Sequence, residues 1–461
     1  MKRIVVIGGG ISGLALLWYL RKRHGSAASL TLLERSNRLG GWINSYKKEG
    51  FLFERGPRSC RTRGSGKATL RLIEELGLQK QVIVADQAAR QRFLYLDKHL
   101  QKIPSHLFSL LFSPLTRQVA FNLFKEWQIP PGENEDETIH AFFTRRLGSD
   151  AAENFLDPLT SGIYGGNIHE LSIKSCFPDL FQWERQHGSL TRGAFLHFFT
   201  NRQSPSSLYI KKMCQESLFS FKEGMQTLSN ALAQNLHESI LHEQEVTDLN
   251  FQKKGIELGL AQGKTLWADQ VYSTLPPASL AALIRPHHLP LANLLSSIAN
   301  ASIAVVGLGY KQKLLTSKGF GYLIPSKEKE EILGMVWDSC IFPQQSLHSL
   351  ETRLTVMIGG TRMSDFSQRK ESDFLNSALK AISNHLQFHA APDVVDIHLA
   401  QNAIPQYVVG HEQKKMLIGK YLQELSPHLQ LLGSAFNGVS VNDCIAQAYS
   451  MAYSRLIPDS I

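Results

Sequence analysis

The chain has 461 residues, 43% of them hydrophobic and 19% charged, which excludes an intrinsically disordered or low-complexity protein and corresponds to about three domains. Its net charge of +9 favours anionic partners, but basic residues occur only in short runs without a nucleic-acid-binding motif, so nucleic acid is not a predicted partner. The five cysteines lie far apart without a CxxC pair, which argues against a disulfide framework or a zinc site and favours a reducing cytoplasm.

Residues 4–20 are almost entirely apolar with basic residues on both sides, a pattern that a signal anchor also shows. Gly8, Gly9 and Gly10 interrupt this run, which is short for a spanning helix, and no small-residue cleavage site follows. A buried strand at 4–7, a glycine turn and a helix from residue 14 onward therefore fit better. No other stretch reaches about 18 apolar residues, so no transmembrane helix is predicted.

The turn after this strand matches the pattern G-x-G-x-x-G, in which the first glycine allows the turn and the second lets a pyrophosphate approach the backbone. The third glycine lets the helix pack closely on the strand, and the helix N-terminus favours the phosphate charge. A second strand at 30–33 ends in Glu34, which is placed to accept hydrogen bonds from a ribose. The predicted phosphate-binding residues are Gly8, Gly9, Gly10, Ile11, Ser12 and Gly13.

The residues after Glu34 favour FAD over NAD, because Arg38 begins an R-x-G-G element found after the first βαβ unit of many flavoproteins. Arg38 can reach phosphate oxygens, although a solvated surface charge is the alternative. Arg35, Gly41 and Trp42 are assigned to the same cofactor site. No second dinucleotide fingerprint is found, since the glycines at 255–259 and 307–309 do not fit one. The substrate is therefore expected to reduce the flavin directly, and oxygen or another small acceptor to reoxidise it.

From residue 53 onward the sequence resembles the oxygen-dependent protoporphyrinogen oxidases, flavoproteins of haem biosynthesis within the amine-oxidase-like superfamily. The resemblance covers nearly the whole chain in order. The Gly-Pro-Arg element at 56–58 and the Val-Asn-Asp-Cys stretch at 441–444 are its more specific parts. The matching segments are FERGPR at 53–58, QRFLY at 91–95, ELSIKSCFP at 170–178, GFG at 319–321, VMIGG at 356–360, IPQY at 404–407 and GVSVNDCI at 438–445.

This resemblance implies an α/β and α+β multidomain fold with a Rossmann-type, p-hydroxybenzoate-hydroxylase-like FAD domain. The FAD domain is expected from 1–88, 216–281 and 426–461, and a mixed-sheet substrate-binding domain from 89–102, 201–215 and 282–425. A helical membrane-binding lobe is expected at 103–200. Residues 104–127 support this lobe, because aromatic residues and leucines with basic flanks suit an interfacial helix on acidic lipid, although an ordinary core helix pair is the alternative.

The resemblance also implies the remaining cofactor contacts. A strand at 432–434 and a helix reaching residue 452 are predicted around the C-terminal contacts, and Val246 in an edge strand is placed near the adenine or simply in the core. Monoamine oxidases attach FAD through a cysteine in this region, whereas 434–437 lack a thiol, so the FAD is predicted to be non-covalent and Cys444 a buried packing residue. Relatives commonly carry glycine where this chain has Ser59, so the sequence departs from the family pattern at this position. The implied contacts are Gly56, Pro57, Arg58, Ser59, Val246, Ser434, Val439, Ser440 and Val441.

The substrate implied is protoporphyrinogen IX, a flexible apolar macrocycle with two propionates, in a large apolar pocket with a few positive charges. Arg58 and Arg92 are the predicted propionate partners, with a surface ion pair as the alternative for Arg92. Phe320 and Met357 have plain core packing as their alternative. The predicted substrate-binding residues are Arg92, Gly162, Gly166, Phe320, Leu323 and Met357.

The implied reaction removes six electrons in three hydride transfers to flavin N5, and oxygen then gives hydrogen peroxide. No catalytic residue and no metal site are identified. The protein is expected in the cytoplasm, peripherally bound to the inner face of an anionic membrane, and a homodimer is left open. The alternatives are a coproporphyrinogen III oxidase of the same fold, another amine-oxidase-like flavoenzyme acting on an amine or polyene, and a flavin-binding membrane scaffold without turnover.

Overall fold

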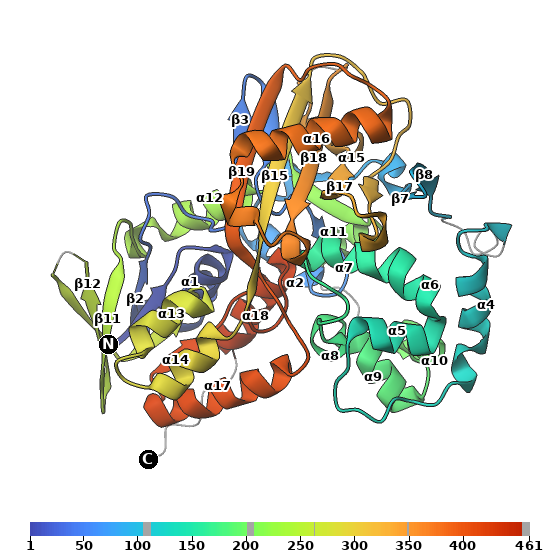
Figure 1. Cartoon of the computed structure of the whole chain (residues 1–461). Helices are drawn as coiled ribbons and strands as arrows, with labels where there is room; N and C mark the ends of the chain where they lie inside the picture. The colour runs from blue at the N-terminus through green and yellow to red at the C-terminus, as the bar shows by residue number, and fades with distance from the viewer. Residues whose placement is uncertain (105–111, 201–206, 262, 348–349, 454–461) are drawn as a thin grey trace.

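The computed structural model describes residues 1–461 except 105–111, 201–206, 262, 348–349 and 454–461 (Figure 1). Residues 105–111 of the predicted interfacial stretch at 104–127 lie outside the described residues. Residues 201–206 of the predicted substrate-binding domain also lie outside them. Within the described residues no helix is long and apolar enough to cross a membrane. Three parts are visible in Figure 1: a nucleotide-binding sheet with its helices, a larger mixed sheet, and a group of helices beside both.

The nucleotide-binding part is a five-stranded parallel sheet in the order β10-β2-β1-β14-β20. Its strands come from three distant stretches of the chain, at 2–33, 240–273 and 429–431. The strand predicted at 432–434 ends earlier, because Gly433 turns the chain with a φ of +131°. The strands are β1 (Lys2–Ile7), β2 (Ala28–Leu33), β10 (Ile240–Leu241), β14 (Gln270–Ser273) and β20 (Leu429–Leu431).

Alternating side chains of β1 bury both faces of this sheet: Ile4 and Val6 pack in one core and Val5 and Ile7 in another. The first face is covered by α1 (Ile11–His24), α2 (Gly66–Glu75), α11 (Leu208–Met213), α12 (Gln226–Leu236) and α18 (Val441–Tyr453). The second is covered by β11 (Val246–Gln252), β12 (Gly255–Leu260), β13 (Thr265–Ala268), α13 (Pro277–Ile284), α14 (Leu289–Ser296) and α17 (His411–Leu425).

This packing differs from the predicted domain boundaries at three helices. The predicted substrate-binding domain includes α11, α14 and α17, but their buried side chains join the cores on the two faces of the five-stranded sheet. Ile210 and Met213 of α11 pack with the first core, whereas Leu291 of α14 and Ile418 of α17 pack with the second. These segments therefore pack with the five-stranded sheet and not with the larger one.

The larger sheet has seven strands in the order β19-β15-β18-β17-β16-β7-β8, with α16 (Glu371–Leu386) over one face. Ala304 and Val306 of β15 point toward α16, while Ile303 and Val305 point to the opposite face. The strands are β7 (Phe93–Leu96), β8 (His99–Lys102), β15 (Asn300–Tyr310), β16 (Gly321–Leu323), β17 (Ile332–Val336), β18 (Thr352–Gly359) and β19 (Val394–Pro405). Shorter strands form two further small sheets, β3-β4 and β5-β9-β6. They are β3 (Ser45–Lys48), β4 (Phe51–Glu54), β5 (Cys60–Arg61), β6 (Val82–Val84) and β9 (Leu218–Phe221).

The described part of the predicted helical lobe consists of helices joined by loops. Its helices are α4 (Arg117–Lys125), α5 (Ile139–Leu147), α6 (Ser149–Ala151), α7 (Asp157–Tyr164), α8 (Ile173–Cys176), α9 (Pro178–His187) and α10 (Leu190–Thr200), with a π-helical turn at Ala152–Leu156. The fully buried side chains of Arg146, Glu126 and Glu184 hold this lobe together through ion pairs. Glu126 also accepts hydrogen bonds from the Ser189 hydroxyl at 2.7 Å and the Leu190 amide at 2.8 Å, which ties the end of α4 to the start of α10.

Candidate active site

The glycine turn between β1 and α1 has the geometry that a dinucleotide requires. Gly8 has a φ of +104°, which favours glycine, and a Cβ on Gly13 would lie 2.0 Å from the Gly8 carbonyl oxygen. Gly10 differs, because a Cβ there would meet only the Cα of Gly41, at 3.9 Å. The protein therefore leaves an open space beside Gly10. This space lies between the glycine turn and the R-x-G-G loop at 38–41.

This open space fits the pyrophosphate of FAD. It lies at the first turn of α1, whose free N–H groups and dipole favour anions. Glu34 follows β2 and accepts hydrogen bonds from the Gly9 amide at 2.7 Å and the Ser36 amide at 2.9 Å, so its carboxylate is held beside the turn. The arrangement is the one that places a ribose next to an acidic side chain in dinucleotide folds.

Arg38 has a different position from the one predicted. Its guanidinium donates to the carbonyl oxygens of Leu39 at 3.1 Å, Ile43 at 2.9 Å and Gly41. These bonds fold the R-x-G-G loop around the arginine, so Arg38 shapes the loop and its donors are directed at carbonyl groups. Arg35 is exposed at the surface just before the loop.

Val246 begins β11, which is an edge strand as predicted. Its side chain is buried in the core beside Leu33. Two residues earlier, the Gln244 amide donates to the Glu34 carbonyl oxygen at 2.9 Å. The start of β11 therefore lies beside the expected ribose position, while the Val246 side chain itself serves the core.

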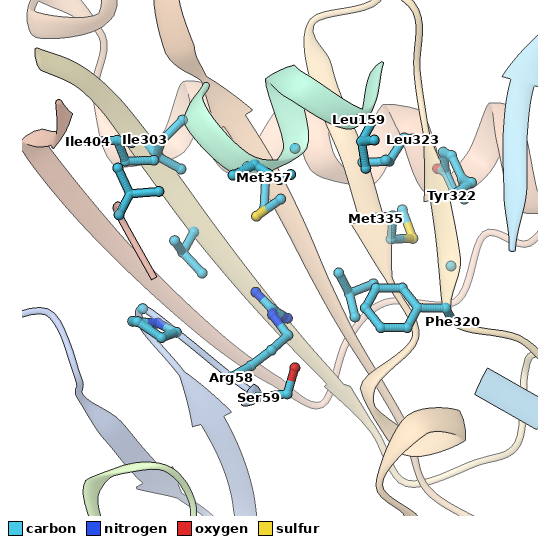
Figure 2. Close-up of a pocket in the computed structure, with 18 of the residues that line it drawn as sticks. Arg58, Ser59, Leu159, Ile303, Phe320, Tyr322, Leu323, Met335, Met357 and Ile404 are labelled. Carbon is cyan, nitrogen blue, oxygen red and sulfur yellow. The ribbon is translucent and has the colours of Figure 1, made fainter. Parts of the chain in front are cut away.

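A cavity of about 660 Å³ lies where the three parts of the molecule meet, and this volume is in the usual range for a small-molecule site (Figure 2). Most of its wall is apolar. The predicted cofactor residues on its wall are Trp42, Gly56, Pro57, Arg58, Ser59, Ser434 and Val439. The predicted substrate residues on the same wall are Arg92, Gly162, Phe320, Leu323 and Met357. The chain thus brings the two predicted sets together around one space.

Three predicted residues lie behind this wall. Gly166 packs against other protein atoms, since a Cβ there would lie 2.4 Å from the Gln406 side-chain oxygen. Ser440 caps α18, where its hydroxyl and the Asp443 carboxylate form reciprocal hydrogen bonds with the backbone. Val441 is buried in the core. Ser59 is on the wall, and it is not among the described residues with left-handed backbone, so glycine is not needed there.

One side of the cavity is formed by α7, which crosses the larger sheet (Figure 2). Leu159, Gly162 and Ile163 lie on this side, and a Cβ on Gly162 would be 2.9 Å from a Leu323 methyl group. Asp157, the first residue of α7, forms an ion pair with Arg362 at 3.0 Å and accepts a hydrogen bond from the Ser326 amide at 2.6 Å. These contacts fasten α7 to the sheet and so fix the width of the cavity.

Several wall residues were not selected from the sequence. Ile303 and Val305 of β15 reach the cavity because alternate residues of a strand share a face, and Phe155 and Leu159 have helical spacing. In Figure 2, Ile303 lies at one end of the cavity and Phe320 toward the other, with Arg58 directed toward Met357 between them.

The basic residues on the wall fall into two pairs. Arg55 is bound to Asp396 at 2.6 Å and Arg58 to Asp338 at 3.0 Å, so both of these charges are compensated. Arg61 and Arg92 form no ion pair with any described residue. Both side chains are exposed to solvent in part, and Arg92 lies 5.4 Å from the Phe320 ring centre. Partial desolvation of the Arg92 guanidinium, together with the nearby Arg61 charge, lowers its pKa. No described aspartate, glutamate, histidine or lysine lines the cavity.

Cys444 lies in the first turn of α18, and burial raises the pKa of its thiol to about 11. Its thiol contacts the Ser12 hydroxyl in the first turn of α1, so the first turns of these two helices lie side by side. The prediction that Cys444 is a buried packing residue is confirmed.

Comparison with known proteins gives a consistent result. The sequence model described as "Flavin containing amine oxidoreductase" matches residues 11–453. A protoporphyrinogen oxidase of Bos taurus is 38% identical over 459 residues, covering 96% of each chain. A coproporphyrinogen III oxidase of Bacillus subtilis is 29% identical over 462 residues, covering 97% of this chain and 96% of the relative. A crystal structure from Exiguobacterium sp. 255-15, provisionally assigned as a protoporphyrinogen oxidase, has a TM-score of 0.80 with 26% identity and covers 98% of both chains.

Proposed function

Because this chain belongs to the flavin-containing amine oxidoreductase family, we propose that it oxidises protoporphyrinogen IX to protoporphyrin IX as an FAD-dependent enzyme. The relative of highest identity reported above carries that activity in its name and is matched over nearly its full length. The cavity supports the proposal, because its apolar wall suits a macrocycle and borders the residues expected to hold FAD.

The observation that carries the choice of substrate is the charge on the cavity wall. Arg61 and Arg92 are uncompensated by described residues, and protoporphyrinogen has two propionates to pair with them. Coproporphyrinogen III has four carboxylates, and Arg55 and Arg58 are already neutralised by Asp396 and Asp338. The match in charge favours the dicarboxylate, and the four-carboxylate substrate of the Bacillus relative is the second candidate.

Bound FAD would supply the hydride acceptor for each of three two-electron steps. The chain's own residues bind and orient: Arg61 and Arg92 hold the propionates, while Met357, Leu323 and Phe320 surround the macrocycle and exclude water. No described carboxylate, imidazole or lysine amine lines the cavity, so no side chain on its described wall is assigned the proton released in each step. Molecular oxygen as the final acceptor is part of the proposal.

Mixing the purified holoprotein with each porphyrinogen tests this function. Under anaerobic conditions we expect protoporphyrinogen to bleach the yellow flavin absorption. In air we expect porphyrin fluorescence to appear together with three molecules of hydrogen peroxide for each porphyrin. Faster turnover of coproporphyrinogen III would replace the first candidate by the second, and no bleaching by either compound would reject both.

We also propose that the helical lobe binds peripherally to the inner, anionic face of a membrane from the cytoplasm. Phe121, Phe124 and Trp127 form an aromatic patch on α4 and the turn after it, with 50%, 64% and 62% of their surface exposed. Lys125 lies over the Phe121 ring at 4.3 Å, so the patch carries a basic residue. Exposed aromatic residues with adjacent basic residues are typical of interfacial helices, and the buried Glu126 holds the patch in place.

Replacing Phe124 and Trp127 together by serine is expected to lower the partition coefficient onto vesicles containing phosphatidylserine by roughly a hundredfold, since each aromatic side chain contributes about 1.5 kcal/mol or more of burial. Vesicle flotation measures this coefficient. Leu289→Ser is the matched control, because Leu289 is 54% exposed on α14, outside the helical lobe. Equal loss in both variants, or none in the double variant, would contradict the membrane proposal.

A further inference from the structure

Tyr407 is a fully buried tyrosine whose hydroxyl joins the two ends of one loop. Its side chain is 1% exposed and follows the end of β19 by two residues. The hydroxyl donates to the Ser434 carbonyl oxygen and accepts from the Gly438 amide at 3.0 Å. Burial raises the pKa of this hydroxyl well above its usual range, so it remains protonated and continues to donate.

Tyr407 is itself fixed from its other side. Its carbonyl oxygen accepts hydrogen bonds from the Ser172 amide at 2.8 Å and the Cys176 thiol at 3.8 Å, both in the helical lobe. Its ring stacks on His411 with a centroid distance of 4.3 Å and an interplanar angle of 16°. The hydroxyl therefore has a fixed position relative to the helical lobe and to α17.

The loop it joins, residues 434–438, borders the candidate active site. Ser434 and the next residue after the loop, Val439, are on the cavity wall. Gly433 and Gly438 flank the loop with φ values of +131° and +106°, and glycine at both ends leaves the backbone many conformations in the absence of other contacts. Directly after the loop, Ser440 caps α18, whose N-terminal dipole favours negative charge.

We propose that Tyr407 is a positioning residue that holds the 434–438 loop and the start of α18 in the geometry that binds FAD and stabilises its reduced, anionic form. The hydroxyl acts through the loop backbone and does not itself touch the reacting atoms. The proposal depends on FAD as the cofactor and is independent of which porphyrinogen is oxidised.

Tyr407→Phe removes only the hydroxyl and keeps the stacking on His411. We expect the Kd for FAD to rise on the order of tenfold, equal to about 1.4 kcal/mol. We also expect the flavin midpoint potential, measured by reductive titration without porphyrinogen, to become more negative because the N–H groups of the loop and helix are less well directed. Thermal unfolding of the apoprotein reports any general loss of stability.

Tyr164→Phe is the matched control. Tyr164 is also a buried tyrosine, its hydroxyl donates to the Cys176 carbonyl at 3.2 Å, and its ring lies 5.8 Å from that of Tyr407, but it has no bond to the loop. We expect it to lower the unfolding temperature by a similar amount and to leave the potential unchanged. Equal changes in FAD affinity and potential in both variants, or neither change in Tyr407→Phe, would overturn the proposal.

Gly433→Ala disturbs the same loop from its other end. A Cβ at Gly433 has space, with Thr274 O nearest at 3.8 Å, but the φ of +131° is strained for alanine. We expect the Kd for FAD to rise and the flavin potential to become more negative, as in Tyr407→Phe. In the double variant of Tyr407→Phe and Gly433→Ala, we expect changes smaller than the sum of the two single-variant changes. If Tyr407→Phe fails to fold, the flavin potential of Gly433→Ala tests the proposal instead. An unchanged potential in Gly433→Ala would reject the role of the loop.

Discussion

Gly10→Val is expected to yield a folded protein that no longer retains FAD. In the protein alone a Cβ at Gly10 meets no atom closer than 3.9 Å, and its φ of −71° and ψ of 177° suit any residue. The side chain would instead occupy the space that the pyrophosphate needs at the first turn of α1. We expect the affinity for FAD to fall by at least about a hundredfold, or about 2.7 kcal/mol.

Flavin absorbance after gel filtration and the far-ultraviolet circular dichroism of the same sample test this expectation together. Gly419→Ala on α17 is the control, because nothing lies within 4 Å of a Cβ there and alanine favours the helix. Gly13→Ala provides a contrast: its Cβ would lie 2.0 Å from the Gly8 carbonyl oxygen, so the fold itself should suffer. A Gly10→Val protein with full flavin content would show that the cofactor does not approach this turn.

The strand, the glycine turn and the helix at the N-terminus could be predicted because their signals are local. The strand, glycine turn, helix and Glu34 follow one another within one βαβ unit, and each residue type has a backbone reason for its position. The outer boundaries were harder. Both α14 and α17 lie within 282–425, the segment predicted for the substrate-binding domain. Only their packing in the folded chain shows that they cover the five-stranded sheet. Contacts between distant segments leave no comparable local pattern in a single sequence.

The same reason explains the differences between the predicted site residues and the observed cavity wall. Arg58 and Arg61 look equivalent in sequence, but Asp338, 280 residues away, neutralises Arg58 in the folded chain. Arg58 is a predicted propionate partner and Arg61 is not, whereas among the wall arginines it is Arg61 and Arg92 that have no ion pair with a described residue. Gly166 is predicted from a motif that borders the cavity. In the structure the space beside its Cα is filled by the Gln406 side chain and does not open into the cavity. Which charge is free and which glycine faces a space are properties of tertiary packing.

Arg61→Ala and Arg92→Ala are each expected to lower kcat/KM for protoporphyrinogen by roughly 10- to 100-fold with flavin content retained. A hydrogen bond to a charged group contributes about 1.5–3 kcal/mol, and each arginine is assigned one propionate. The double variant should lose roughly a thousandfold or more, reduced by relief of the repulsion between the two arginines. Arg92→Lys should give an intermediate loss, because it keeps the charge and loses the bidentate geometry.

The comparison that isolates the carboxylate contact is Arg90→Ala. Arg90 is an exposed arginine two residues from Arg92 and is absent from the cavity wall, so this variant makes the same change in net charge near the mouth. Its kcat/KM should stay within about twofold of wild type, since Arg90 does not line the cavity and a charge without a direct contact acts weakly through water and salt. Equal loss in Arg90→Ala would mean that general attraction of the anionic substrate, and not a defined pair of contacts, governs the reaction. Full activity in Arg61→Ala would show that Arg61 does not bind a propionate. It would also remove the charge argument that favours protoporphyrinogen over coproporphyrinogen III.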